Sequence, residues 1–150
     1  MKVVILGSGR IGSMLAREMD RVGHEVTIID QNPDAFLRLG KSFEGVTLLG
    51  NGLDQDVLRQ AGINEADAFV AVTQGDNRNI MSAQIAREIF GVDRVVARIN
   101  DPIRAQAYGE LGIHTLCIGS IGAGMLRDHL LSRPYEPLES YRTIGTEPDY

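Results

Sequence analysis

Three glycines near the N-terminus have the spacing of a phosphate-binding loop. The segment Gly7-Ser8-Gly9-Arg10-Ile11-Gly12 follows the apolar run Val3-Val4-Ile5-Leu6 and precedes a stretch in which apolar residues recur with helical spacing. In this setting Gly7 permits a tight turn, Gly9 lets the backbone approach a pyrophosphate, and Gly12 lets the helix pack against the strand. The start of the helix then offers unpaired N–H groups to an anion. The spacing predicts a nucleotide phosphate loop, although the same glycines would also suit a strand that merely packs against a helix.

Two charged residues narrow the choice of nucleotide. Asp30 ends the next apolar run, eighteen positions after Gly12, where a carboxylate would accept hydrogen bonds from ribose hydroxyls. It would also repel a 2′-phosphate, so NADP is not expected. Arg10 could donate several hydrogen bonds to a terminal phosphate, which favours ATP or ADP over NAD(H), because the second phosphate of a dinucleotide carries a nucleoside. The alternatives are a turn residue at Asp30 and a solvated side chain at Arg10.

Polar residues also follow three later apolar runs. Because ligands of parallel sheets lie beyond the carboxyl ends of the strands, we expect Asn51-Gly52-Leu53-Asp54 to frame an adenine, Thr73 to lie near the ribose or phosphates, and Arg98 to add positive charge. Each could instead be a loop or capping residue, and Asp54 and Asp76 are natural helix N-caps. The candidate nucleotide-binding residues are Gly7, Ser8, Gly9, Arg10, Ile11, Gly12, Asp30, Gln31, Asn51, Gly52, Leu53, Thr73, Gln74, Asn77 and Arg98.

Six short apolar runs alternate with segments of helical spacing. This alternation predicts an α/β, doubly wound Rossmann fold with a six-stranded, mainly parallel sheet. The predicted strands are residues 3–6, 26–29, 46–49, 68–72, 95–99 and 114–118. The predicted helices are residues 10–22, 33–39, 54–61, 76–90, a segment from Pro102 to about Gly109, and 121–131.

The composition changes after Leu131. Residues 132–150 contain Pro134, Pro137 and Pro148 and show no strand or helix period. We expect residues 1–131 to form one nucleotide-binding domain, and residues 132–150 to be a linker or loosely attached tail, or to lead to a C-terminal domain. The N-terminal apolar run is too short for a signal peptide or a membrane span, so we expect a cytoplasmic protein without direct membrane insertion.

No constellation of residues indicates catalysis. His24, His114 and His129 do not follow a strand near the glycine loop, and Cys117 is the only cysteine, which excludes an internal disulfide and a thiolate metal site. We therefore expect no catalytic residue, no metal and no enzymatic activity. The formal charge of −5 argues against nucleic acid as a partner. The competing interpretations are the NAD-binding half of an oxidoreductase and an NADH redox sensor that represses DNA, although no basic helix-turn-helix segment is visible.

Together these motifs resemble the N-terminal domain of the regulator-of-potassium-conductance (RCK, or KTN) family, in the form found in TrkA-type potassium-uptake regulatory proteins. The resemblance extends over about residues 1–131. It includes more than the glycine loop. The block at residues 23–30 and the block at residues 50–52 with 56–63 are more specific than that loop. The matching blocks are residues 3–12, 23–30, 50–52 with 56–63, 66–73, 76–77 and 96–99.

The resemblance implies a cytosolic, nucleotide-sensing regulatory subunit of a membrane potassium channel or transporter, located at the inner face of the membrane through its partner. Such domains pair into homodimers and commonly form rings, and ATP, ADP or NAD(H) in the crevice shifts the ring between shapes. An arginine at the position of Arg10 often distinguishes ATP from ADP. Several members hold a cation through a Pro-Glu pair after the last strand, but Ile118-Gly119-Ser120-Ile121 stands there in this chain, so that site is not carried over. Candidates for the dimer contact are Ile80, Ile85, Ile89 and Met125, although core packing is the commoner fate of such residues.

Overall fold

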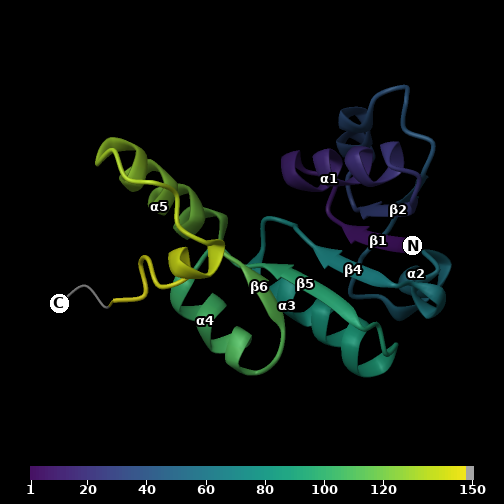
Figure 1. Cartoon of the computed structure of the whole chain (residues 1–150). Helices are drawn as coiled ribbons and strands as arrows, with labels where there is room; N and C mark the ends of the chain where they lie inside the picture. The colour runs from purple at the N-terminus through teal and green to yellow at the C-terminus, as the bar shows by residue number, and fades with distance from the viewer. Residues whose placement is uncertain (148–150) are drawn as a thin grey trace.

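A computed structural model describes residues 1–147 of the chain. Its centre is one six-stranded sheet in which every strand is parallel to its neighbours, in the order β3-β2-β1-β4-β5-β6 (Figure 1). The chain therefore winds outward from β1 and β4 in both directions, which confirms the predicted doubly wound Rossmann fold. The strands are β1 (Lys2–Leu6), β2 (Glu25–Asp30), β3 (Val46–Leu49), β4 (Ala68–Ala71), β5 (Arg94–Arg98) and β6 (His114–Leu116).

Helical segments connect the strands. Within the described residues, no helix is both long enough and apolar enough to span a bilayer. The α-helices are α1 (Arg10–Arg21), α2 (Gln55–Gln60), α3 (Asp76–Gln84), α4 (Pro102–Glu110) and α5 (Ile118–Leu130). The other helical segments are the 3₁₀ helices η1 (Pro33–Leu39), η2 (Ile63–Glu65) and η4 (Leu138–Tyr141), and the π-helical turn η3 (Ile85–Ile89).

The continuous apolar run of β1 is buried on both faces of the sheet. Val3 and Ile5 pack into a cluster with Ala16 of α1, whereas Val4 and Leu6 pack into a second cluster that includes residues of α2, β4 and α3. All four side chains of this run are at most 3% exposed. Burial of each is worth about 1.5–3 kcal/mol, so these clusters hold the carboxyl end of β1, and the glycine loop after it, in place.

Two predicted helices differ from the expected type. The segment after Asn32 is a 3₁₀ helix, Pro33–Leu39, capped by the Asn32 side chain, which accepts a hydrogen bond from Asp34 N. The helix predicted for residues 76–90 begins as α3 and continues from Ile85 as a π-helical turn, in which Phe90 N donates to Ile85 O at 3.3 Å. An apolar period of about four residues does not distinguish these helix types, so the sequence predicted only that the segments are helical.

The segment after α5 is attached rather than loose. α5 extends away from the sheet, and the chain after Leu131 turns back along it (Figure 1). Tyr141 is 1% exposed and lies beside Gly124, where a Cβ atom would be 2.2 Å from Tyr141 Cδ1. The Tyr141 hydroxyl donates to Asp128 at 2.9 Å and accepts from Glu136 N at 2.8 Å. The Tyr141 side chain thus packs part of this segment on α5, although the segment has no strand or helix period in its sequence, and its role as a linker or tail stays a prediction. The domain division at Leu131 stays a prediction.

Candidate functional site

A cleft of about 860 Å³ opens at the carboxyl ends of the central strands, where the strand order reverses. Ten of the predicted residues line it, namely Gly7, Gly9, Arg10, Ile11, Asp30, Gln31, Gly52, Thr73, Gln74 and Arg98. A separate cavity of about 520 Å³ lies between α4, β6 and η4, and none of the predicted residues lines it. The cleft at the switch point is therefore the candidate site.

The three glycines of the loop serve different purposes. Gly7 has a φ of +105°, which favours glycine, and its N–H donates to Ile29 O at 2.8 Å. At Gly12 a Cβ atom would lie 1.8 Å from Gly7 O, so only glycine allows α1 to approach the turn this closely. At Gly9 nothing lies within 4 Å of a Cβ position. The protein itself thus gives no steric reason for Gly9, and the space beside it belongs to the cleft.

The N-terminus of α1 faces the same space. Among the described residues, no side chain caps the N-terminus of α1, and the first turn of this helix contains no acidic residue. The partial positive charge of the helix start is therefore not neutralised by its own side chains. Such a helix start can accept a phosphate oxygen on its backbone N–H groups.

Asp30 connects two turns at the edge of the cleft. Its Oδ2 accepts a hydrogen bond from Ser8 N at 2.7 Å, and its Oδ1 accepts one from Asn32 N at 2.8 Å. Each carboxylate oxygen has a further lone pair, and the residue is half-buried. Ser8 itself is buried below the cleft surface, with its Oγ donating to Ala35 O at 3.2 Å. The structure thus fixes the carboxylate at the cleft edge with acceptor capacity left for a hydroxyl.

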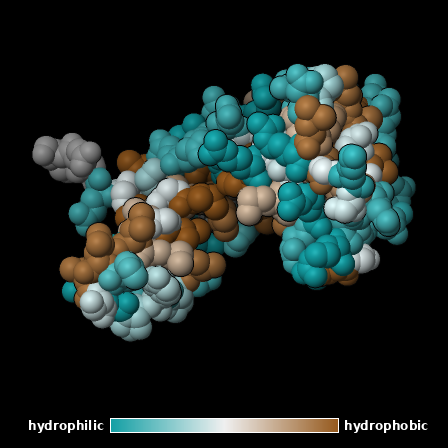
Figure 2. Space-filling model, turned by 90° about the horizontal axis from the view of Figure 1, so that it is seen from above, coloured by the Kyte–Doolittle hydropathy of each residue, from teal (hydrophilic) through white to brown (hydrophobic). Residues whose placement is uncertain are grey.

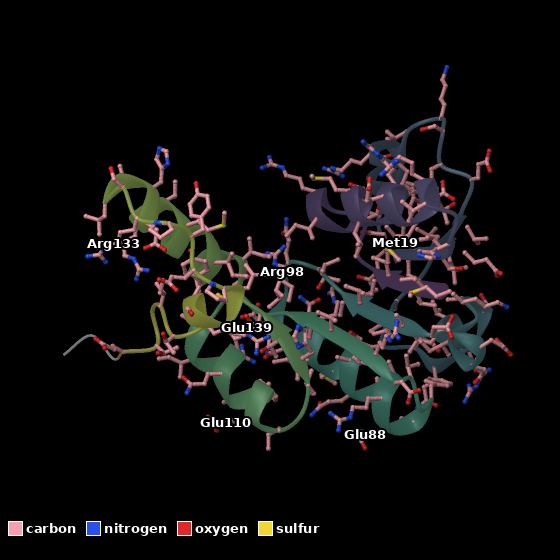
Figure 3. All side chains as sticks on the ribbon, viewed as in Figure 1. Met19, Glu88, Arg98, Glu110, Arg133 and Glu139 are labelled. Atoms are coloured by element: carbon pink, nitrogen blue, oxygen red, sulfur yellow. The ribbon has the colours of Figure 1, made fainter. Side chains whose placement is uncertain are left out.

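Four arginines line the cleft, and Asp30 is the only carboxylate among its described lining residues. Arg10 and Arg98 were predicted, whereas Arg38 of η1 and Arg78 of α3 were missed. Each lies in the helical segment that follows a strand's carboxyl end, seven or eight residues after that strand, which is the signal that could have indicated them. Figure 3 shows Arg98 between the end of β5 and the N-terminal end of α1. The cleft concentrates positive charge in a chain of net charge −5, which suits a polyanionic ligand.

Five predicted residues do not line the cleft. Ser8 and Gly12 are buried beneath it, Leu53 is half-buried, and Asn51 accepts a hydrogen bond from Leu53 N at 3.1 Å. Asn77 instead accepts a hydrogen bond from Arg104 of α4. These residues shape the loops around the cleft.

The two predicted N-caps have different outcomes. Asp54 caps α2, accepting a hydrogen bond from Asp56 N at 2.8 Å, which confirms that prediction. The N-cap of α3 is Gly75, so the prediction for Asp76 was wrong. The Asp76 carboxylate instead accepts hydrogen bonds from Asn100 N at 2.9 Å and Asp101 N at 3.2 Å. A nonlocal contact between two loops has taken the side chain away from its own helix.

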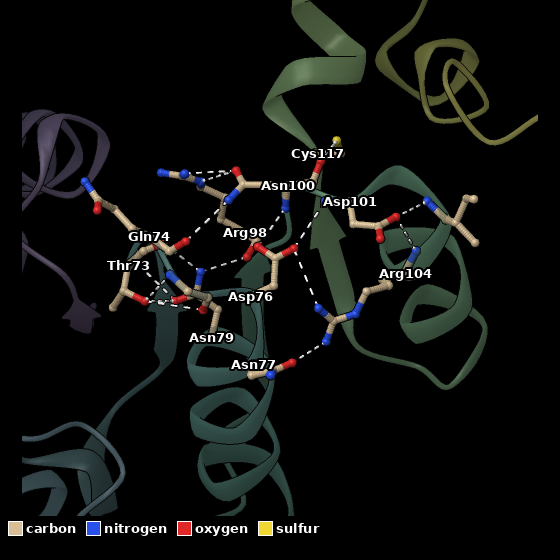
Figure 4. A network of polar contacts seen from close by, with 12 residues as sticks. Thr73, Gln74, Asp76, Asn77, Asn79, Arg98, Asn100, Asp101, Arg104 and Cys117 are labelled. Carbon is tan, nitrogen blue, oxygen red and sulfur yellow. Dashed lines mark hydrogen bonds and ion pairs between the residues drawn. The ribbon is translucent and has the colours of Figure 1, made fainter. Parts of the chain in front are cut away.

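A buried asparagine joins the strand ends on the β4–β5 side of the cleft (Figure 4). The Nδ2 of Asn79 donates to Thr73 O at 2.9 Å and to Arg98 O at 2.8 Å. Its Oδ1 accepts from Thr73 N at 2.9 Å and from Thr73 Oγ1 at 2.6 Å. All four hydrogen-bonding positions of the amide are used, so Thr73 and Arg98 are held in a fixed relation. Asn79 could not be predicted as a site residue, because nothing local in the sequence distinguishes it from other polar residues of the helix.

The strand order, the switch point and the glycine loop together define a Rossmann-type domain. The chain matches the TrkA-N domain model over residues 3–118 and belongs to that family, which confirms the predicted resemblance. It is 51% identical to the Trk system potassium uptake protein TrkA of Streptomyces coelicolor over 147 residues, which are 98% of this chain and 66% of that protein. The chain spans from about half to about two thirds of the length of the first curated relatives it matches.

Two solved structures of GsuK are also similar. GsuK bound to ADP is 28% identical, with a TM-score of 0.73, over 86% of this chain and 33% of that chain. The GsuK channel bound to NAD is 26% identical, with a TM-score of 0.72, over 96% of this chain and 24% of that chain.

Proposed function

We propose that this chain is the nucleotide-sensing part of a regulatory subunit of a potassium transport system. The observation that carries the proposal is the composition of the cleft, which combines an uncapped helix start, an open Gly9, the Asp30 carboxylate and four arginines. Two findings support it: the TrkA relative is named as a potassium uptake protein, and the GsuK structures hold ADP and NAD.

From the strand order we infer the direction in which a nucleotide would bind. Asp30 ends β2, the glycine loop follows β1, Thr73 follows β4, and Arg98 ends β5. Since these strands are neighbours in the order β2-β1-β4-β5, the ribose would bind Asp30, the phosphates would cross the α1 N-terminus, and the distal end would lie near Thr73 and Arg98. The ligand is an adenine nucleotide (ATP or ADP) or NAD(H).

The proposed mechanism is a shift in population between conformations. A nucleotide that binds one conformation better than another shifts the equilibrium by that difference in affinity and no more. The regulated partner would be a membrane potassium channel or transporter subunit, contacted from the cytoplasmic side. The chain would act there as a homodimer or larger ring, without catalysis, direct membrane insertion or nucleic acid. The exposed Ile89 and Met125 remain dimer candidates, whereas the expectation for Ile80 was wrong, because it is 3% exposed in the core.

Ligand-dependent thermal unfolding tests the proposal. ATP, ADP and NADH are each added to the purified chain, and those that bind should raise the unfolding midpoint in proportion to their concentration relative to Kd. Asp30→Ala should weaken binding about tenfold, the effect of losing hydrogen bonds to a charged group. The exposed Asp34→Ala is the matched control and should bind as the natural chain does.

Three results would contradict the proposal. The first is no response to any of these nucleotides. The second is equal affinities in Asp30→Ala and Asp34→Ala, which would remove Asp30 from the ribose site. The third is consumption of NADH in the presence of small carbonyl compounds, which would favour the oxidoreductase interpretation.

A further inference from the structure

The edge of the sheet at β6 borders a cavity that is separate from the nucleotide cleft. This cavity of about 520 Å³ is lined by residues of α4, β6, α5 and the segment that returns along α5 (Figure 1). None of its lining residues lines the cleft, and none belongs to β5. Since β6 is the last strand in the order and, among the described strands, pairs with β5 alone, the cavity lies on the open side of β6.

Thr115 presents both of its backbone groups on that open side. Leu116 O accepts a hydrogen bond from Ile99 N at 3.1 Å, so the backbone groups of Leu116 face the β5 side. The backbone groups of successive strand residues point to alternate sides, so those of Thr115 face away from β5. Ile113, also on the open side, donates its N–H to Tyr108 O at 3.2 Å. Within residues 1–147, by contrast, neither the N–H nor the C=O of Thr115 pairs with another group of the chain.

Thr115 is also fixed in place and largely withdrawn from bulk solvent. It is 7% exposed, and its Oγ1 donates to Ala105 O of α4 at 2.7 Å. A buried backbone group without a partner costs free energy, and folded proteins pair nearly all such groups. The donor and the acceptor of Thr115 are thus held beside a cavity, ready for a ligand that offers the complementary pair.

The ligand that offers this pair is an extended peptide. In an antiparallel arrangement, one residue of the added strand donates its N–H to Thr115 O and accepts from Thr115 N. The side chain of that residue lies on the same face of the sheet as the Thr115 side chain, which is the face that α4 covers. An aliphatic side chain suits the apolar part of the cavity lining, which consists of Ala105, Ile113, Leu116, Ile121 and Leu138.

The charges of the lining argue against a nucleotide in this cavity. Glu110, at the end of α4, and Glu139, on η4, outnumber Arg142, the one arginine among the described lining residues (Figure 3). The cleft, by contrast, is lined by four arginines and one carboxylate. The two glutamates would repel a phosphate, whereas they would attract a peptide with cationic ends.

We propose that the open edge of β6 is a docking site for an extended apolar segment of a partner protein. The segment adds to the sheet as a seventh strand through Thr115 and places one aliphatic side chain in the cavity. Backbone pairing supplies the affinity, and the cavity selects the side chain. The site is independent of the nucleotide cleft and stands whether or not the cleft binds a nucleotide.

A short synthetic peptide tests the edge directly. The ¹⁵N-labelled chain is titrated with acetyl-Lys-Thr-Leu-Thr-Lys-amide, and the amide NMR signals and hydrogen-exchange rates are measured. We expect saturable shifts centred on Thr115 and slower exchange of its N–H, because that N–H gains an acceptor. The same peptide with N-methylleucine at its centre cannot donate to Thr115 O and should bind about tenfold more weakly. Aspartate in place of the leucine should also weaken binding about tenfold or more, because its charge would enter the apolar cavity.

Gly109→Leu tests the cavity by filling it from the α4 side. A Cβ atom at Gly109 would lie 3.5 Å from Thr115 Oγ1, an ordinary contact, so the new side chain extends toward β6 without strain. Leucine also has the higher helix propensity, so the thermal midpoint should not fall. This variant should bind the leucine peptide at least about tenfold more weakly. Gly119→Leu, at an exposed glycine of α5 outside the cavity, is the matched control and should bind as the natural chain does.

Any of three observations overturns the docking site. One is the absence of a saturable shift at Thr115 up to the solubility limit of the leucine peptide. Another is equal affinity of the natural chain for the leucine and N-methylleucine peptides, or equal affinity of Gly109→Leu and Gly119→Leu for the leucine peptide. The last is protection of the Thr115 N–H that rises with protein concentration without any peptide, which would assign the edge to a second copy of this chain. The peptide comparisons use the natural chain, so they decide the question even if Gly109→Leu does not fold.

Discussion

Gly9 and Gly12 occupy the same loop for different physical reasons. Gly12 is required by the protein itself, because any side chain there would collide with the backbone oxygen of Gly7. Gly9 has ordinary extended backbone angles and open space around it, so its lack of a side chain benefits only what enters the cleft. Two residues of one motif can therefore be separated by experiment into a folding role and a binding role.

Alanine substitutions make that separation. Gly12→Ala should lower the free energy of unfolding by about 3 kcal/mol or more, as expected for overpacking against backbone. Gly9→Ala should change it by about 0.5 kcal/mol or less but weaken nucleotide binding at least tenfold, because its methyl group occupies the approach of the phosphates. Urea unfolding and calorimetric titration with ADP measure the two effects. If Gly9→Ala bound ADP normally, the phosphates would not pass over Gly9.

Arg10 is exposed at the first position of α1 and lines the cleft. We expect Arg10→Ala to reduce the difference in affinity between ATP and ADP more than it reduces the affinity for ADP, because only the longer ligand offers a further phosphate. Arg17→Ala, exposed on the same helix away from the cleft, is the control. Equal losses for both ligands would assign Arg10 a general electrostatic role.

The ends of β4 and β5 are joined by a side chain rather than by backbone alone. The fully buried side-chain amide of Asn79 makes four hydrogen bonds. Removing this amide would leave backbone groups of Thr73 and Arg98 without partners. We expect Asn79→Ala to lower the free energy of unfolding by about 2–4 kcal/mol, since each unpaired buried group costs about 1–3 kcal/mol. Asn64→Ala, at an exposed asparagine of η2, is the control. Urea unfolding of both variants is the measurement. Equal stability of the two variants would show that Asn79 is not a clamp.

The attachment of the returning segment to α5 should depend on pH at both extremes. The hydrogen bond from Arg127 lowers the pKa of Asp128 most; burial opposes this, but the hydrogen bond from the Tyr141 hydroxyl and the charges of nearby arginines lower the pKa further. The folded pKa of Asp128 therefore lies below its unfolded pKa. Its contribution to stability is present above the unfolded pKa and is lost as the pH falls through the folded pKa. Burial, followed by the hydrogen bond to Asp128, raises the pKa of Tyr141, so its contribution is present below about pH 10 and is lost as the pH rises through the folded value.

Tyr141→Phe isolates the alkaline half of this dependence. The free energy of unfolding of the natural chain should fall more between pH 9 and 11 than that of Tyr141→Phe, because the variant has no hydroxyl to ionise there. Tyr135→Phe, which removes an exposed hydroxyl, should behave as the natural chain does. Parallel curves for all three proteins would show that Tyr141 does not contribute through its hydroxyl.

The sequence could predict what depends on local pattern. Continuous apolar runs such as Val3–Leu6 indicated all six strands, and a glycine loop followed by an acidic strand end indicated most of the cleft. Arg38 and Asn79 were missed because their roles depend on which distant segments they meet. The packing of Tyr141 on α5 was missed for the same reason. Tertiary contacts, rather than propensities, determine these positions.

α5 presents an apolar surface that nothing in the described part of the chain covers. Figure 2 shows apolar side chains gathered along one side and in the central hollow of this face. Leu126 and Leu130 are 66% and 80% exposed, and Ile118 and Met125 are also exposed. A surface of this kind on a helix that stands away from the sheet favours contact with a second copy.

Replacing Leu126 and Leu130 together by glutamate should convert the proposed dimer to a monomer, because two charges would be buried in the contact. Size-exclusion chromatography with light scattering measures the mass directly. Leu37→Glu is the control, since Leu37 is 80% exposed on η1, at another part of the surface. If the double variant kept the mass of the natural chain while that mass was dimeric, the contact would lie elsewhere.

The fit of Tyr141 beside Gly124 has a consequence for the evolution of this family. The ring occupies the volume that a side chain at position 124 would need, so neither position can change freely while the other is kept. Among homologous sequences we expect covariation, with glycine at the first position accompanied by an aromatic residue at the second, and larger residues at the first by small ones at the second. Asp128 should vary with the same pair, because it accepts the tyrosine hydroxyl. Independent variation at these three positions would indicate that relatives hold this segment differently.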